Sequence, residues 1–108
     1  MQIIYNKDVV KFLNDLIDIL FDNEYFSYYD SSKKYVLKLK SEIQKTIHIK
    51  QKYNTPPRLI EYGKHYKKFT ISKRTTWVVF YTLKNGTYYI NHITNNHSSD
   101  SQYISGIR

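Results

Sequence analysis

The last third of the chain gathers the side-chain types that can act on a phosphate group without a metal. RNA can be cleaved by its own 2′-hydroxyl if a base removes that proton, cations stabilise the charge on the phosphate, and an acid protonates the leaving oxygen. His, Lys, Arg and Tyr can fill all three roles. Residues of these types in this region include Lys67, Lys68, Lys73, Arg74, His92, His97 and Tyr103. The region therefore favours metal-free chemistry on phosphate.

Other reaction classes find little support in the residue types. The chain has no cysteine, so a thiol nucleophile, disulfide bonds and thiolate metal ligands are excluded. His92 and His97 are an odd number of residues apart, so they would point to opposite faces of one strand. No Asp or Glu lies between Glu61 and Asp100, and the 3 glycines form no phosphate-binding loop. We therefore expect neither a metal nor another cofactor.

An Asn85-Gly86 pair organises this region into a hairpin. Such a pair between β-rich runs favours a type I′ turn, because both central residues need a positive φ. The residue pattern around it predicts three antiparallel strands, at about 67–73, 75–83 and 87–95. The middle strand carries an uninterrupted apolar run, which indicates burial on both of its faces.

The turn also predicts which residues lie opposite each other. With a two-residue loop, Lys84 pairs with Thr87, and the remaining pairs follow by counting. These pairs are Val78 with Ile93, Thr76 with Asn95, and Arg74 with His97. We therefore expect the four residues of the last two pairs to share one face, at the end far from the turn. This group is either a functional site or simply a polar end of the sheet.

The N-terminal half predicts a short strand and two helices. Residues 2–5 are partly β-branched, and Asn6 is a suitable N-cap for a helix over 7–22. Ser31 or Ser32 can cap a second helix that runs to about residue 50. Its apolar arc consists of Val36, Leu39, Ile43 and Ile47. We expect the two helices to pair antiparallel and to pack this arc on one face of the sheet.

Charge is distributed unevenly along the chain. The net charge is +8, made up of −4 in residues 1–30 and +12 in residues 31–108. A basic body of this size attracts polyanions such as nucleic acids. Most of the cations are lysines, and an AT-rich coding sequence would also favour lysine, but such a bias does not explain the asymmetry.

Regularly spaced lysines lie on the second helix, on the side away from its apolar arc. Such a row can follow the backbone of a nucleic acid, although a lysine row is also the usual solvated face of a helix. Arg58 and Lys67 add further positive charge beyond the helix. The candidate nucleic-acid-binding residues are Lys34, Lys38, Lys45, Lys52, Arg58 and Lys67.

The chain length bounds the organisation of the protein. Residues 1–108 fit a single domain, without repeats or low-complexity segments. We find no apolar run long enough for a membrane span and no signal-peptide pattern. Together with the lack of cysteine, these features lead us to expect a cytoplasmic protein.

The order of elements and two motifs resemble a known family. The motifs are RTTWVVFY from Arg74 and, after a short turn, YYINHITNNH, which ends at His97. With Tyr103 a few residues later, this pattern is similar to the RelE/ParE toxins of bacterial type II toxin–antitoxin systems, also called plasmid stabilisation proteins. The resemblance covers nearly the whole chain. It implies an α+β fold of order β-α-α-β-β-β, with a small antiparallel sheet and two N-terminal helices on one face.

The resemblance also implies an activity and partners. Many members are ribosome-dependent mRNA endoribonucleases that use no cofactor. By this resemblance, Lys68, Lys73 or Arg74 would stabilise the transition state, and His97 or Tyr103 would transfer protons. The implied partners are a cognate antitoxin protein, the ribosome and mRNA.

Two positions depart from the catalytic members of the family. Trp77 stands directly before Val78, where many catalytic relatives carry an arginine, and Ser98 follows His97 where a basic residue is frequent. These departures leave open the gyrase-poisoning branch of the family, which shares the fold and whose target is DNA gyrase. A basic interaction domain, or a toxin that has lost its activity, is the third alternative.

Overall fold

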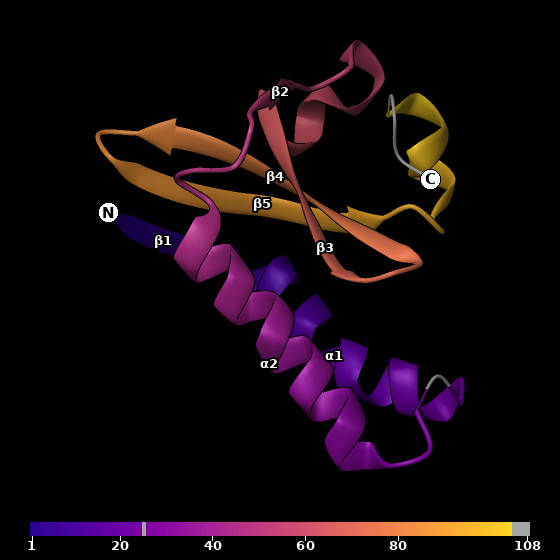
Figure 1. Cartoon of the computed structure of the whole chain (residues 1–108). Coiled ribbons are helices and arrows are strands. Elements are labelled where there is room, and N and C mark those ends of the chain that lie inside the picture. The colour runs from indigo at the N-terminus through magenta and orange to yellow at the C-terminus, as the bar shows by residue number, and fades with distance from the viewer. Residues whose placement is uncertain (25, 105–108) are drawn as a thin grey trace.

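The computed structural model describes residues 1–24 and 26–104 and shows an α+β fold with a five-stranded mixed sheet. Two helices cover one face of the sheet, and two short 3-10 helices lie on the opposite face (Figure 1). The elements are β1 (Gln2–Tyr5), α1 (Lys7–Asp22), α2 (Tyr29–Thr46), β2 (Tyr53–Asn54), η1 (Pro57–Tyr62), β3 (His65–Ser72), β4 (Thr75–Lys84), β5 (Thr87–Asn95) and η2 (Ser99–Tyr103).

The sheet has the order β1-β5-β4-β3-β2, with the predicted meander of β3, β4 and β5 at its centre. The expectation of an entirely antiparallel sheet is wrong, because β1 pairs parallel with β5, with Gln2 opposite Thr87 and Tyr5 opposite Ile90. The short strand β2 pairs with the start of β3 and was not predicted. Two residues are too few to carry a periodic pattern, so the pairing depends on tertiary structure.

The predicted bounds of α1 are confirmed, and those of α2 need correction. The Asn6 side chain accepts a hydrogen bond from the Val9 amide at 2.8 Å, as an N-cap should. Helix α2 begins at Tyr29, ahead of both predicted caps, and ends at Thr46 rather than near residue 50. Ser32 is fully buried on the packed side of the helix, so packing has overridden its preference for a cap.

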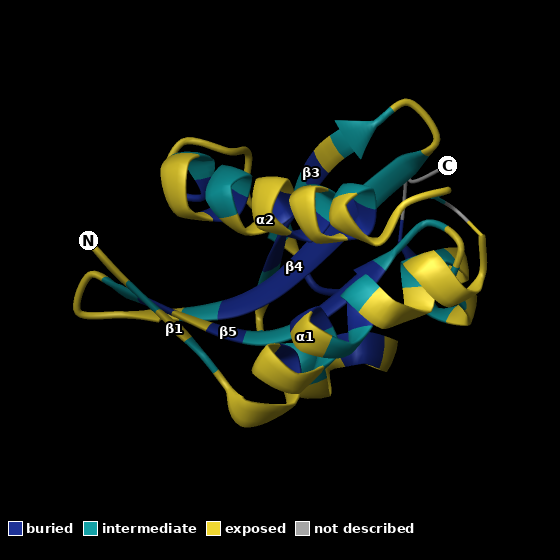
Figure 2. Ribbon diagram, turned by 90° about the horizontal axis from the view of Figure 1, so that it is seen from below, coloured by how far each residue is buried: buried dark blue, intermediate teal, exposed yellow. Residues whose placement is uncertain are grey.

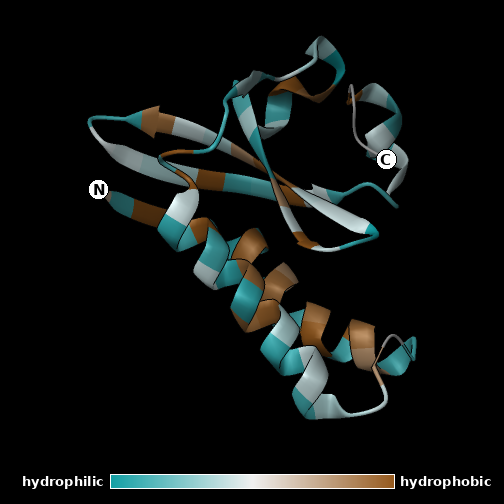
Figure 3. Cartoon of the chain, viewed as in Figure 1, coloured by the Kyte–Doolittle hydropathy of each residue, from teal (hydrophilic) through white to brown (hydrophobic). Residues whose placement is uncertain are grey.

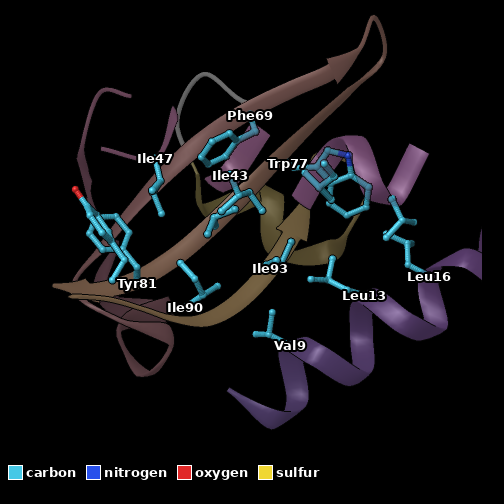
Figure 4. Packing of buried hydrophobic residues seen from close by; sticks show 14 residues of the cluster. Val9, Leu13, Leu16, Ile43, Ile47, Phe69, Trp77, Tyr81, Ile90 and Ile93 are labelled. Carbon is cyan, nitrogen blue, oxygen red and sulfur yellow. The ribbon is translucent and has the colours of Figure 1, made fainter. Parts of the chain in front are cut away.

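The main core lies between the helix pair and the sheet. The predicted arc of α2 is confirmed, since the exposed fraction is 2% for Val36 and 0% for Leu39, Ile43 and Ile47. Figure 2 shows the alternation of buried and exposed positions along α2, and Figure 3 the apolar side of α1. In Figure 4, side chains of α1 point toward the apolar side chains of β4 and β5.

A smaller core covers the opposite face of the sheet. Val78 and Phe80 of β4 pack there against Leu59 of η1 and Ile104. Because β4 also contributes Trp77 and Val79 to the main core, the predicted burial of this strand on both faces is confirmed. Tyr103 packs against this smaller core, so the segment that ends at Ile104 folds back onto the sheet. Among the described residues, no helix is long and apolar enough to cross a bilayer.

A β-bulge in β5 changes the register that the turn predicted. Near the turn the prediction holds, with Lys84 opposite Thr87 and positive φ at Asn85 and Gly86. Tyr81 still lies opposite Ile90, but Phe80 lies opposite His92, so Asn91 is an extra residue. Beyond this point the predicted pairs are wrong, and the observed ones are Val79 with Ile93, Val78 with Thr94, and Trp77 with Asn95.

Hydrogen bonds from two directions hold the bulge. Its carbonyl oxygen at Asn91 accepts from the Asn6 side chain at 2.9 Å, and the Asn91 side chain donates to Thr82 at 3.1 Å. Gly63, with a φ of 133°, lies so close that a Cβ there would be 2.9 Å from the Tyr81 carbonyl oxygen. The bulge allows Ile90 and Ile93, three positions apart, both to face the helices.

Candidate functional site

The shifted register decides which polar residues meet at the end of the sheet far from the Asn-Gly turn. The Nε2 atom of His97 lies 3.2 Å from the Thr75 hydroxyl, so Thr75 rather than Arg74 is its partner across the hairpin. Arg74 instead belongs to an exposed two-residue turn with Lys73, between β3 and β4. The expectation that Arg74 and His97 oppose each other on one face is therefore wrong, and the bulge at Asn91 is the reason.

Asn96 connects this turn to the end of β5, a role that the sequence did not reveal. Its side chain accepts from the Thr76 amide at 2.9 Å and donates to the Arg74 carbonyl oxygen at 3.1 Å. The His97 amide in turn donates to the Asn95 side chain at 2.8 Å. The backbone of the Lys73–Arg74 turn is thus fixed next to His97, although the side chains of Arg74 and His97 are not paired across the sheet.

A pocket of about 370 Å³ lies beside these residues, between the helix pair and the sheet. Thr75, Asn95 and His97 form part of its rim, and Lys38 reaches it from α2. The aromatic rings of Phe26, Tyr35 and Trp77 belong to its lining. The volume is within the range of small-molecule sites.

A chain of hydrogen bonds crosses the inner side of this pocket. The Trp77 indole donates to the Tyr35 hydroxyl at 3.0 Å, and that hydroxyl lies 3.3 Å from the Ser72 hydroxyl. Trp77 is 1% exposed, so its ring acts as a wall and holds Tyr35 in place. Tyr35 and Ser72 were missed because their proximity joins α2 to β3 across a wide sequence separation.

The remaining candidate catalytic residues lie on the other face of the sheet. Tyr103 packs on the smaller core, and the guanidinium of Arg58 is 4.9 Å from the centre of its ring. The Lys68 ammonium lies 4.5 Å from the centre of the Tyr53 ring, which packs on the same core. The structure therefore brings Arg58 and Tyr103 together, and it does not gather Tyr103 or Lys68 with His97.

The lysine candidates occupy three different environments. Lys34, Lys38 and Lys45 are exposed on α2, as predicted. Lys52 lies beyond the end of α2, so it belongs to a separate basic region near β2. Lys67 is 5% exposed and donates to the Ile47 carbonyl oxygen, which corrects its assignment as a phosphate contact.

The aromatic surroundings explain why Lys67 tolerates burial. Its ammonium lies 5.6 Å from the ring centres of both Tyr81 and Tyr88, where a cation is favoured. Burial still lowers the pKa of Lys67, and the charge of Lys52 lowers it further. Burial and the neighbouring Tyr88 raise the pKa of Tyr81 to about 12, so Tyr81 is neutral at physiological pH.

His92, which we listed among the residues whose types can act on a phosphate, has a packing role. Its ring stacks on Tyr62 at 3.8 Å with an angle of 12°, and its Nε2 atom is 3.9 Å from the Asp100 carboxylate. Burial lowers the pKa of His92, while the charges of Asp100 and Glu61 oppose this effect. These contacts attach η1 and η2 to the sheet.

Nowhere in residues 1–24 and 26–104 do three or more His, Cys, Asp or Glu side chains gather in a way that could hold a metal ion. The candidate site consists of the Lys73–Arg74 turn, Thr75 with His97, and the adjacent pocket.

Comparison with known proteins gave no relative: no family model, no curated protein and no solved structure matches the chain. The fold class is thus defined by the structure itself, as a five-stranded mixed sheet with two helices on one face.

Proposed function

We propose that the protein is a toxin of the RelE/ParE type that cleaves mRNA on the ribosome. The observation that carries this proposal is the site at the start of β4. There a basic Lys73–Arg74 turn lies next to a histidine held by Thr75, at the rim of an aromatic-lined pocket. The order of strand, two helices and meander, with the helices on one face, supports the same family.

In this proposal the RNA supplies its own nucleophile. His97 accepts the proton of the 2′-hydroxyl, which attacks the adjacent phosphorus and displaces the 5′-oxygen. Lys73 and Arg74 stabilise the charge that develops on the phosphate oxygens. Because Tyr103 lies on the other face, His97 then returns the proton to the leaving 5′-oxygen. Thr75 keeps the imidazole in position for both transfers.

The rest of the basic surface contributes to binding. Lys38 reaches the rim of the pocket, and a nucleobase fits the pocket by size and by its aromatic lining. Lys34 and Lys45 lie on the exposed side of α2 and contact phosphates of the message or of ribosomal RNA.

The proposal includes a cognate antitoxin. Such a partner would neutralise the cationic surface with an extended or helical acidic segment that orders on binding. This assignment depends on the family resemblance, and the gene next to that of the protein provides a simple check. A small reading frame for an acidic or DNA-binding protein would support the proposal.

The test is translation of a defined message by purified ribosomes, with cleavage sites mapped by primer extension. Arg74→Ala should reduce cleavage much more than ribosome binding, because the charge is needed mainly in the transition state. His97→Gln should reduce cleavage by about 10²–10⁴-fold, the usual contribution of general acid–base catalysis. Tyr103→Phe should leave cleavage close to that of the wild type, since the ring lies on the other face.

Two further variants complete this test. Lys38→Ala should weaken ribosome binding and its salt dependence, with less effect on cleavage. Lys33→Ala removes another exposed cation of α2 that the proposal does not use and serves as the control. If Lys33→Ala and Arg74→Ala have equal effects, the turn has no special role in catalysis.

Inhibition of DNA gyrase is the second candidate function, and one observation favours it. Trp77, at the position where catalytic relatives carry an arginine, is buried and points toward the helices, so this position supplies no charge. Growth arrest with intact messages and accumulated DNA breaks would support gyrase as the target. An inactive wild-type protein in both assays would support the third alternative, a basic interaction domain.

A further inference from the structure

We propose that the opposite end of the sheet holds a second anion site that takes a phosphate group. The site, called here the basic hollow, is formed by Lys52, Lys64, His65 and Lys84 around a hollow of about 570 Å³. The inference goes beyond the proposed function, since it requires binding of an anion and no cleavage of RNA.

The fold brings the four basic residues together from separate parts of the chain. Lys52 lies just before β2, Lys64 directly precedes β3, His65 is the first residue of β3, and Lys84 ends β4. His65 is opposite Tyr81 in the antiparallel pair of β3 and β4, so the start of β3 lies beside the end of β4. The pairing of β2 with β3 adds the segment that carries Lys52.

The basic hollow is remote from the Lys73–Arg74 turn. Thr75 and Lys84 mark the two ends of β4, and this separation of nine residues corresponds to about 30 Å at the rise of a strand. A single phosphate cannot contact both ends. The two regions are therefore separate sites, although one RNA strand is long enough to reach both.

No carboxylate lies among the described residues that line the basic hollow. In the described part of the chain, ion pairs join Lys11 to Asp15 and His92 to Asp100, both away from this region. The buried ammonium of Lys67 lies over Tyr81, a lining residue, and adds a further positive charge.

The effects of these charges on one another support the same inference. Burial lowers the pKa of His65, and the charges of Lys52 and Lys64 lower it further. Lys52 also lowers the pKa of Lys67, after the larger effect of burial. The cations are thus close enough to repel each other, and a bound anion would relieve this repulsion. A bound anion should therefore raise the pKa of His65.

Phosphate is the anion that suits the basic hollow best. A phosphate carries up to two negative charges and several acceptor oxygens, so it can accept from ammonium groups that approach from different sides. The volume exceeds that of a phosphate alone, and the exposed side chain of Leu83 offers an apolar surface to the remainder of a ligand. The phosphate belongs either to a free phosphomonoester or to the backbone of a single-stranded nucleic acid.

The test follows the pKa of His65 by NMR at low salt, with inorganic phosphate in one series and a pentauridylate in another. We expect one or both ligands to raise the pKa of His65. His92 is half-buried against Tyr62 on the other face and should not respond, so it is the control within the same spectrum. A shift with inorganic phosphate indicates a monoester site, and a shift with pentauridylate alone indicates a backbone site.

Variants identify the residues that bind. The double variant Lys64→Gln/Lys84→Gln should lose the response of His65 and weaken binding by at least tenfold. For pentauridylate, the slope of log affinity against log salt should fall by about 1.4, since each phosphate contact with a single strand contributes about 0.7. Lys33→Gln/Lys40→Gln removes the same charge from α2, outside the basic hollow, and should leave the His65 response unchanged.

Two results would overturn the inference. One is a His65 pKa that neither ligand changes in the folded wild-type protein. The other is a double variant at Lys64 and Lys84 that binds as tightly as the control pair. Neither result depends on cleavage, so failure of this inference is distinguishable from failure of the ribonuclease proposal, which the Arg74 and His97 variants test.

Discussion

Asn6 provides the sharpest test of how the structure sets the register of the site. Its side chain accepts from the Val9 amide and donates to the Asn91 carbonyl oxygen. Loss of an Asn N-cap costs about 0.5–2 kcal/mol. Loss of a hydrogen bond such as that to Asn91 costs about 0.5–1.5 kcal/mol. We therefore expect Asn6→Ala to lower the free energy of unfolding by about 1–3.5 kcal/mol.

Asn6→Ser separates the two contributions. Serine caps a helix as well as asparagine, but its side chain is too short to reach the bulge. The variant should retain the cap and lose only the bond to the Asn91 carbonyl oxygen, at a cost of about 0.5–1.5 kcal/mol. The bulge determines that Thr75 lies opposite His97, so NMR signals of these two residues should change in both variants.

Urea unfolding, followed by circular dichroism, measures these differences, and an unchanged m-value would show that the compared states are the same. If Asn6→Ser is as stable as the wild type, the side chain of Asn6 does not stabilise the bulge. If Asn6→Ala and Asn6→Ser are equally destabilised, the cap makes no contribution. Either result would refute the reasoning that one side chain fixes both the helix start and the strand register.

Three further predictions concern the core and the pH dependence of stability. Leu39→Ala should lower the free energy of unfolding by about 2–5 kcal/mol, because the side chain is fully buried. Trp77→Phe should cost about 1–3 kcal/mol through lost volume and the lost bond to Tyr35, and a double-mutant cycle with Tyr35→Phe should show that the two residues are coupled. Since burial lowers the pKa of His92 from 6.5, the folded state binds fewer protons than the unfolded state, and stability should fall as the pH drops below 6.5 and through the folded pKa. Urea unfolding between pH 7.5 and 5 should show a weaker dependence for His92→Phe, and an unchanged dependence would assign the effect to other groups.

The register of β5 shows where counting from a turn fails. The Asn-Gly turn correctly predicted the pairing of Lys84 with Thr87, because turn geometry acts on the residues next to it. It could not predict the pairs beyond Asn91, since a bulge adds a residue to one strand only. A signal was nevertheless present in the sequence. Tyr88 and Ile90 are two positions apart, but Ile93 is three positions after Ile90. In a regular strand, residues three positions apart point to opposite faces, so all three side chains can face the helices only if the strand contains an extra residue.

The candidate site was predictable in its residue types and only partly in its geometry. The exposed lysines of α2 and the location of His97 at one end of the sheet followed from periodicity and strand order. The burial of Lys67 did not follow from the sequence, because a lysine in a strand is normally solvated. The groups that compensate for its burial come from distant segments of the chain. The separation of Tyr103 from His97 was not predictable either, because it depends on contacts between segments that are distant in the sequence.

The sequence by itself determined the local elements of this protein. Helix α1, the apolar arc of α2 and the meander of β3, β4 and β5 follow from spacing, capping and turn chemistry, which act over a few residues. Only the tertiary structure decided the parallel pairing of β1 with β5, the partner of His97 and the convergence of Lys52, Lys64 and Lys84. Those features join segments that are far apart in the chain, and they form because packing of the helices on the sheet fixes which strand edges and which side chains can meet.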